Sequence, residues 1–276
     1  MPADPRPPVG VSLSDQPPRP NLTRSGAGGP TLLAFELATE ACSVAVLHEG
    51  RLLARHEVAP RRHAELALPW ADALLAEAGL AKSQIDALAV GIGPGAFTGV
   101  RLAISLVQGI ALGLDRPVLP VSTLAALAEP FLAEGPVLAA IDARMGELYL
   151  GAFSAGAGGL PETCADALLL PRAAAGPALA GLWMPPDEAA RAEPWLGVGS
   201  GFAAGDGGWW TPWADRFGRV LPAALPTASA VARIARHEWR AGHAVAATAI
   251  EPVYLRDKVA LTAAEQQVAR ASRGAA

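Results

Sequence analysis

Hydrophobic residues occur in short runs that are separated by glycine and polar residues from residue 31 onward. Runs with continuous or alternating apolar positions predict buried or half-buried strands. They cover residues 31–37, 42–47, 51–58, 85–90 and 118–121. Apolar residues at helical spacing, among them Leu66, Trp70 and Leu74, predict a helix over 62–78, and a nearly all-apolar stretch predicts another over 100–114.

The first part of this pattern is repeated later in the chain. In the later copy, an apolar run at 135–141 leads into Asp142, and a second apolar run follows at 147–153. In the first copy, the strand at 31–37 contains Glu36 near its end, and the strand at 42–47 follows it. Such a duplication predicts an α/β protein with two similar lobes that face each other across a cleft, where Glu36 and Asp142 would face each other. Two facing carboxylates suit a metal-bound phosphate or acid/base work, although a lone strand-end acid is more often simply exposed.

The predicted lobes cover residues 31–130 and 131–260. Thr227 or Ser229 begins a further predicted helix that ends near Ala241, whereas residues 160–221, rich in glycine, proline and tryptophan, give no clear pattern. Eight prolines and few large apolar residues predict disorder over 1–30, and the tail 261–276 is expected to fray. The N-terminal stretch has no apolar core of a secretory signal, so we expect a cytoplasmic protein.

A glycine-rich turn joins the predicted strand 85–90 to the helix 100–114. Its sequence, GIGPGAFTGVR at 91–101, contains neither the Gly-Lys-Ser/Thr ending of a Walker A loop nor a Gly-x-Gly-x-x-Gly turn. A strand, a glycine turn and a helix N-terminus together favour an anion or phosphate site, but a turn that only seats a helix on a sheet explains the same residues. The candidate nucleotide or anion cleft, which would be degenerate, consists of Glu36, Thr39, Gly93, Gly95, Thr98, Gly99, Asp142, Gly199 and Gly201.

The helix over 100–114 has a stripe of small residues, because Ser105, Gly109 and Gly113 are four positions apart. A helix with so little polar surface must be buried in its own fold or covered by a partner, and its roughly 15 residues with Arg101 argue against a membrane span. The candidate partner interface consists of Leu66, Trp70, Leu74, Arg101, Ser105, Gln108, Gly109, Leu112 and Gly113.

Composition and charge narrow the function further. A net charge of −4 does not support a self-sufficient nucleic-acid binder, whereas 51% hydrophobic residues suffice for a core. The two cysteines form no metal-type pair, and no two of the five histidines are four residues apart. We therefore expect no metal site.

Several motifs resemble one known family in the same order along residues 31–260. GPGAFTGVRLA is similar to the signature of the TsaB (YeaZ) family, and ELATEACSVAV resembles its opening strand–turn–strand. Further similar blocks are HAELALPWADALL, VSTLAALA, IDARMGELYLGAF, VGSGF and YLRDKVA.

This resemblance implies an actin/Hsp70-like (ASKHA) two-lobed fold and a role in tRNA modification. In that family the subunit is noncatalytic and binds TsaD, which attaches threonylcarbamoyl to N6 of adenosine 37 in tRNAs that read codons starting with A. The ATPase TsaE joins the pair. We expect this chain to reach tRNA only indirectly, although the sequence leaves direct contact open. Where the family has Asp followed two residues later by Ser or Thr, this chain has Glu36 and Ala38. The lost hydroxyl predicts no cofactor and at most weak nucleotide binding.

Three questions remain open from the sequence. A homodimer without TsaD is neither predicted nor excluded. An autonomous ATP-dependent enzyme, a small-molecule kinase or ATPase, would use Glu36, Asp142 and the glycine turn, and would bind Mg-ATP tightly. A peptidase is disfavoured, because no Ser/His/Asp constellation or metal set is recognisable.

Overall fold

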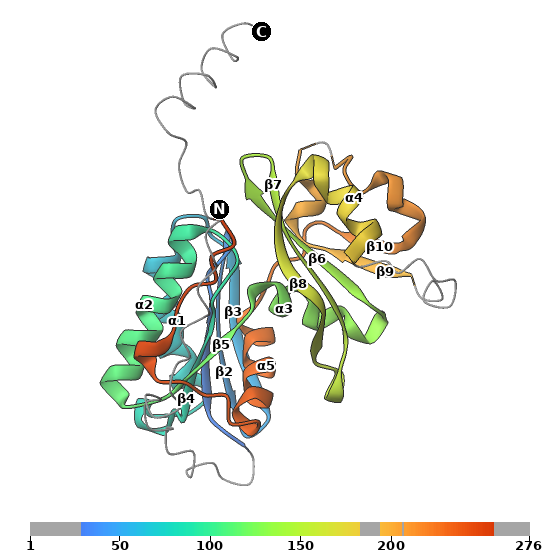
Figure 1. The fold of residues 1–276 in the computed structure, drawn as a ribbon. Helices are drawn as coiled ribbons and strands as arrows, with labels where there is room; N and C mark the ends of the chain where they lie inside the picture. The colour runs from blue at the N-terminus through green and yellow to red at the C-terminus, as the bar shows by residue number, and fades with distance from the viewer. Residues whose placement is uncertain (1–28, 183–193, 206, 257–276) are drawn as a thin grey trace, which may run out of the picture.

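The computed structural model describes residues 29–182, 194–205 and 207–256. Most of the predicted extension 1–30 and all of the predicted tail 261–276 lie outside the described residues. The described chain forms two lobes side by side, each built on a five-stranded mixed sheet (Figure 1).

The first lobe has the strand order β3-β2-β1-β4-β5. Its strands are β1 (Leu32–Glu36), β2 (Ala41–His48), β3 (Arg51–Val58), β4 (Ala87–Gly91) and β5 (Val118–Val121). The central strand β1 pairs antiparallel with β2 and parallel with β4. Every residue of β1 is buried, as expected for a strand with helices on both faces of its sheet.

The second lobe has the order β10-β9-β6-β7-β8. Its strands are β6 (Val137–Arg144), β7 (Glu147–Ala155), β8 (Pro161–Pro171), β9 (Trp195–Val198) and β10 (Phe217–Leu221). The central strand β6 pairs antiparallel with β7 and parallel with β9. Strand β6 therefore takes the place of β1, and the duplication predicted from the sequence is confirmed.

Helices cover both faces of the first sheet. α1 (His63–Glu77) and α2 (Phe97–Leu114) pack over one face, and α5 (Ala228–Arg240) packs over the other (Figure 1). The α5 contacts are with β1, β2, β4 and β5, although the sequence assigned its residues to the lobe 131–260. The chain thus returns to the first lobe after β10, because the apolar face of α5 completes the second side of that sheet.

Two further helices complete the arrangement. α3 (Thr123–Ala128) follows β5, and its Leu124 and Leu127 pack in the core of the second lobe. α4 (Arg172–Leu182) follows β8 and lies against the opposite face of the second sheet. Ion pairs join the lobes, since Arg233 of α5 binds Glu129 after α3, and Arg256 near the C-terminus binds Glu147 of β7.

Candidate functional site

The glycine turn between β4 and α2 packs directly on the turn that follows β1. A Cβ atom at Gly95 would lie 2.5 Å from the carbonyl oxygen of Ala38, and one at Gly99 would lie 2.1 Å from that of Leu37. The backbone N–H of Ala96 donates to the Ala38 carbonyl at 2.7 Å. The glycines therefore permit a close backbone approach, as predicted, and the group that approaches is the chain's own β1–β2 turn.

Thr98 and the start of α2 are less enclosed. Thr98 is exposed in the first turn of the helix, and Gly93 has a φ of +95° in the preceding turn. Val253 donates its N–H to the Ile92 carbonyl and so covers part of this turn. The anion site predicted for these residues stays a prediction. One of the N–H groups that would bind the anion, that of Ala96, already donates to the Ala38 carbonyl.

Glu36 lies beneath the glycine turn and is only 1% exposed. Its Oε1 accepts the N–H of Ala38 at 2.8 Å, and its Oε2 accepts the hydroxyl of Thr123 at 3.0 Å. The same Thr123 oxygen accepts the N–H of Gly93 at 3.1 Å, and a Cβ at Gly91 would lie 1.9 Å from Oε2. The carboxyl group thus joins the end of β1, the glycine turn and the start of α3.

Burial raises the pKa of Glu36 to about 7, and the hydrogen bonds from Ala38 and Thr123 partly oppose this rise. A carboxyl group in this state is about half protonated near neutral pH. Its polar atoms are used within the protein, so the geometry suits an internal structural link better than a ligand to a metal-bound phosphate.

Thr39 and His63 form a second local network at the β1–β2 turn. Thr39 is buried, and its hydroxyl accepts the N–H of Ala41 at 3.4 Å. The Nε2 atom of His63, at the start of α1, lies 3.0 Å from the Thr39 carbonyl oxygen and 3.2 Å from that of Ala41. Because carbonyls only accept hydrogen bonds, Nε2 carries the proton, and His63 ties α1 to this turn.

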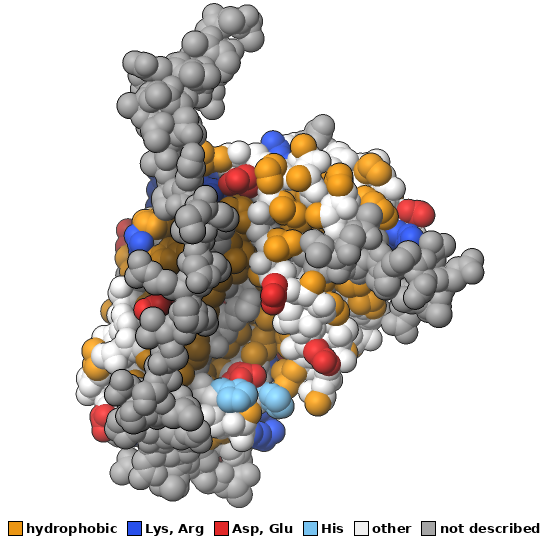
Figure 2. Space-filling view, viewed as in Figure 1, with side chains coloured by type: hydrophobic (Ala, Val, Ile, Leu, Met, Phe, Trp, Pro, Cys, Tyr) orange, Lys and Arg blue, Asp and Glu red, His pale blue; other side chains and the backbone are white. Residues whose placement is uncertain are grey.

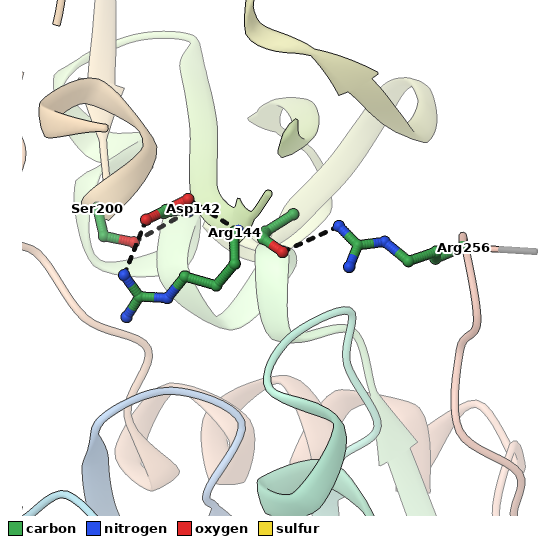
Figure 3. A network of polar contacts seen from close by, with 5 residues as sticks. Asp142, Arg144, Ser200 and Arg256 are labelled. Carbon is green, nitrogen blue, oxygen red and sulfur yellow. Dashed lines mark hydrogen bonds and ion pairs between the residues drawn. The ribbon is translucent and has the colours of Figure 1, made fainter. Parts of the chain in front are cut away.

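Asp142 lies near the end of the equivalent strand of the second lobe, β6, in a different environment. Its Oδ1 accepts the backbone N–H of Arg144 at 2.9 Å, and its Oδ2 lies 3.0 Å from the Arg144 guanidinium (Figure 3). Its own N–H donates to the hydroxyl of Ser200 at 3.1 Å. The partners of Asp142 and Glu36 are therefore separate, and the contacts do not unite the two carboxylates in one site.

Gly199 and Gly201 repeat the close packing of the first glycine turn. A Cβ at Gly199 would lie 2.3 Å from the carbonyl oxygen of Ala140, and one at Gly201 would lie 2.7 Å from the Ala140 side chain. Gly199 also has a φ of +106°. Among the described residues, no group of three or more His, Cys, Asp or Glu side chains is placed to hold a metal ion.

The predicted interface positions on α1 are largely internal. Leu74 is 1% exposed and lies in the core between α1, α2 and the first sheet, while Leu66 and Trp70 are half-buried against the same core. This finding removes Leu74 from the surface, because a side chain that packs on the sheet cannot also contact a partner. Sequence periodicity identified the apolar face of α1. It could not show whether that face packs on the chain's own sheet or on a partner protein.

The small-residue stripe on α2 is on the surface. Ser105, Gly109 and Gly113 are exposed, and a Cβ at either glycine would meet no atom within 4 Å. Leu112 beside them is 62% exposed, whereas Gln108 is half-buried and donates to the Ala247 carbonyl at 3.0 Å. The helix therefore presents a flat face of small and apolar residues that nothing in the described chain covers.

Arg101 is exposed at the N-terminal end of this face. Its guanidinium lies 3.5 Å from the ring centroid of Phe97, and its Nε donates to the Tyr254 hydroxyl at 2.7 Å. Over the 18 residues of α2 the composition is apolar enough to cross a membrane, a test that core helices of soluble proteins also meet. Its buried positions, such as Ala103 and Val107, pack on the first sheet.

Comparison with known proteins identifies the family. Residues 56–182 match the family model of TsaD, tRNA N6-adenosine threonylcarbamoyltransferase. The tRNA threonylcarbamoyladenosine biosynthesis protein TsaB of Escherichia coli K12 is 39% identical over 237 residues, which are 83% of this chain and 96% of the relative. The TsaB protein of Haemophilus influenzae is 37% identical over 235 residues, 83% of this chain and 94% of the relative.

The fold agrees with this assignment. The solved structure of YeaZ from Pseudomonas aeruginosa is 42% identical, covers 82% of this chain and 100% of its own, and superposes with a TM-score of 0.69. The predicted two-lobed, actin-like α/β fold is thereby confirmed. The chain belongs to the TsaB (YeaZ) family of tRNA threonylcarbamoyladenosine biosynthesis proteins.

Proposed function

We propose that this chain is a noncatalytic subunit that binds TsaD and so permits threonylcarbamoyl transfer to N6 of adenosine 37 of tRNA. The observation that carries the proposal is the exposed face of α2, where Ser105, Gly109 and Gly113 leave room for a partner helix at close range. An apolar face of this kind is costly in water unless a partner covers it. The first two helices of TsaD would supply the complementary surface.

The state of the candidate cleft supports a noncatalytic role. Glu36 is enclosed by Ala38, Thr123 and Gly91, and Asp142 is paired with Arg144. Ala38 has no hydroxyl to offer a phosphate. We therefore propose that the chain has no resident cofactor and weak nucleotide affinity at most, and that TsaE and tRNA are reached through TsaD.

The test is light scattering after size-exclusion chromatography, with the chain alone and mixed with TsaD from the same genome. The expected result is a stable one-to-one complex whose interface buries about 1,600 Å². Gly109→Trp and Ser105→Trp should weaken the complex by at least ~30-fold, because the indole ring separates the helices. Neither position is enclosed by the chain's own atoms, so thermal unfolding of both variants should match that of the wild type.

Ala241→Trp is the matched control, since Ala241 is exposed at the end of α5 on the opposite side of the first sheet. It should leave binding unchanged. Two separate peaks for the wild-type mixture would contradict the proposal. Mg-ATP would then be titrated into the chain alone, and saturable binding that Asp142→Ala abolishes would favour the autonomous enzyme instead.

A further inference from the structure

A cavity of about 780 Å³ lies in the second lobe, away from the α2 face and the glycine turn. It is bounded by the β6–β7 turn at Gly146, the beginning of α4 and the tryptophan-rich segment between β9 and β10. Its volume is in the range of sites that enclose small organic ligands. Figure 2 shows hydrophobic side chains over much of the visible face of this lobe.

Arg172, the first residue of α4, lines the cavity with a guanidinium group held in a defined position. Its backbone N–H donates to the Gly146 carbonyl at 2.8 Å. Its Nη1 atom occupies the space that a Cβ at Gly205 would need, 1.9 Å away, and its Nη2 atom lies 4.0 Å from a Cβ position at Gly146. Gly205 thus leaves the room in which the guanidinium lies.

This guanidinium has no acceptor in the part of the chain that the structure describes. Four other arginines of the molecule, Arg144, Arg219, Arg233 and Arg256, each pair with a carboxylate. Arg172 is half-buried, so part of its hydration shell is lost without a compensating hydrogen bond. An anion in the cavity would supply that bond.

The tryptophans of the segment between β9 and β10 also differ in whether their indole N–H groups have an acceptor. Trp209 donates its indole N–H to the Gly201 carbonyl at 2.9 Å, and Trp210 donates to that of Phe202 at 3.2 Å. The indole N–H of Trp213, which also lines the cavity, has no acceptor among the described residues. The cavity therefore combines two donors that have no protein acceptor among the described residues, and none of the described side chains that line it is a carboxylate.

The remaining walls are largely apolar. They include the rings of Pro171, Pro177, Pro212 and Trp209. A bare inorganic anion would use the donors but leave most of these walls in contact with water. We infer that this cavity binds a small organic anion, with a carboxylate or phosphate group on Arg172 and Trp213 and a flat ring against the prolines and Trp209.

The inference does not depend on TsaD binding, because the cavity and the exposed face of α2 are in different lobes. Isothermal titration calorimetry of the full chain tests it with phenyl phosphate and benzoate as probes. At least one probe should bind at a single site with a Kd below ~1 mM. Inorganic phosphate has the anionic group without the ring, and benzyl alcohol has the ring without the anionic group. Each should bind at least ~10-fold more weakly than the aromatic anions.

Arg172→Gln should weaken binding of the aromatic anion by at least ~10-fold, the usual effect of losing a charge-assisted hydrogen bond. Trp213→Phe keeps a ring but removes the N–H, and should weaken binding by about 3-fold. Arg219→Gln is the matched control, because Arg219 is an exposed arginine of the same lobe that pairs with Glu134. It should bind like the wild type.

Circular dichroism checks that each variant is folded, and Trp213→Phe gives a second measurement if Arg172→Gln is not. No saturable heat with either aromatic anion up to ~10 mM would overturn the inference. Undiminished binding in folded Arg172→Gln would also overturn it, as would equally tight binding of benzyl alcohol.

Discussion

The two lobes share a sheet topology but differ in the element that follows their fourth strand. In the first lobe, β4 leads through the glycine turn into α2, a helix of 18 residues. In the second lobe, β9 leads through Gly199 into two short 3-10 turns, Ser200–Ala203 and Thr211–Arg216. Trp213 lies in the second of these turns, and Trp209 and Trp210 come directly before it. One copy of the unit thus presents a helix on the surface, and the other surrounds a cavity.

The strand-end carboxylates differ in the same way. Glu36 is enclosed by the glycine turn and α3, whereas the side chain of Asp142 is 23% exposed and pairs with Arg144. Duplication conserved the backbone path and the close glycine contacts. It did not conserve the environment of the side chains, which depends on what covers each sheet. A duplicated fold therefore presents different side-chain environments in its two halves.

The largest effect is expected where a side chain is added to a glycine turn. Gly99→Ala places a methyl group against the Leu37 carbonyl, so the free energy of unfolding should fall by at least ~3 kcal/mol. Gly201→Ala, its counterpart in the second lobe, should cost less, about 2 kcal/mol, because part of its contact is with the Ala140 side chain. Urea unfolding measures both.

The control for this pair is on the same helix. Gly109→Ala meets no atom within 4 Å, so it should stabilise α2 by ~0.5–1 kcal/mol through helix propensity. If Gly99→Ala were as stable as Gly109→Ala, the close approach between the glycine turn and the β1–β2 turn would not exist in solution.

The carboxylate comparison predicts a pH dependence that belongs to the first lobe. Between about pH 4.5 and 7 the folded chain retains the Glu36 proton that the unfolded chain has released, because the pKa of Glu36 is raised to about 7 in the fold. The free energy of unfolding therefore falls as pH rises through this window, by up to roughly 3 kcal/mol, and this contribution is constant above it.

Glu36→Gln removes this titration, so the difference in stability between the wild type and the variant should change with pH across that window. Urea unfolding at several pH values between about 4 and 8 gives the measurement. Asp142→Asn, at the end of the equivalent strand, should leave the slope from Glu36 in place. A wild-type profile parallel to that of Glu36→Gln would show that Glu36 is not buried as described.

The smallest effects concern ion pairs. Arg233 binds Glu129 through two hydrogen bonds, and the Glu129 side chain is only 10% exposed. Arg233→Met should cost about 2 kcal/mol, since it breaks a bidentate contact between the lobes. Arg144→Met removes an arginine that is 79% exposed, and should cost less than ~0.5 kcal/mol by thermal or urea unfolding. Equal costs would argue against α5 as a link between the lobes.

Much of the fold follows from local sequence patterns. The apolar runs and the strand–acid–turn–strand repeat predicted the duplicated sheets, and Thr227, one of the two predicted starts of the helix that ends near Ala241, caps α5 with its side chain. The glycine turn that contains Gly99 was recognised as a position of close backbone approach, whereas Gly201 was predicted only as part of the candidate cleft. These features depend on a few neighbouring residues, so the sequence alone determines them.

The region 160–221 was not readable for a physical reason. Helix α4 contains Gly176 and Pro177, which are poor helix formers, and β9 has only four residues. Packing on the second sheet stabilises these elements in spite of weak local preference. The cavity at Arg172 was missed for the same reason, because its walls come from three separate segments of the chain.

The sequence by itself determined the α/β class, the duplication, the glycine turns and the apolar character of α2. Only the tertiary structure decided that Glu36 is buried under Thr123, that Leu74 faces the core and that α5 returns to the first sheet. Each of these depends on contacts between residues far apart in the chain. Periodicity shows that a side of an element is apolar, and the packing of the other elements decides what that side contacts.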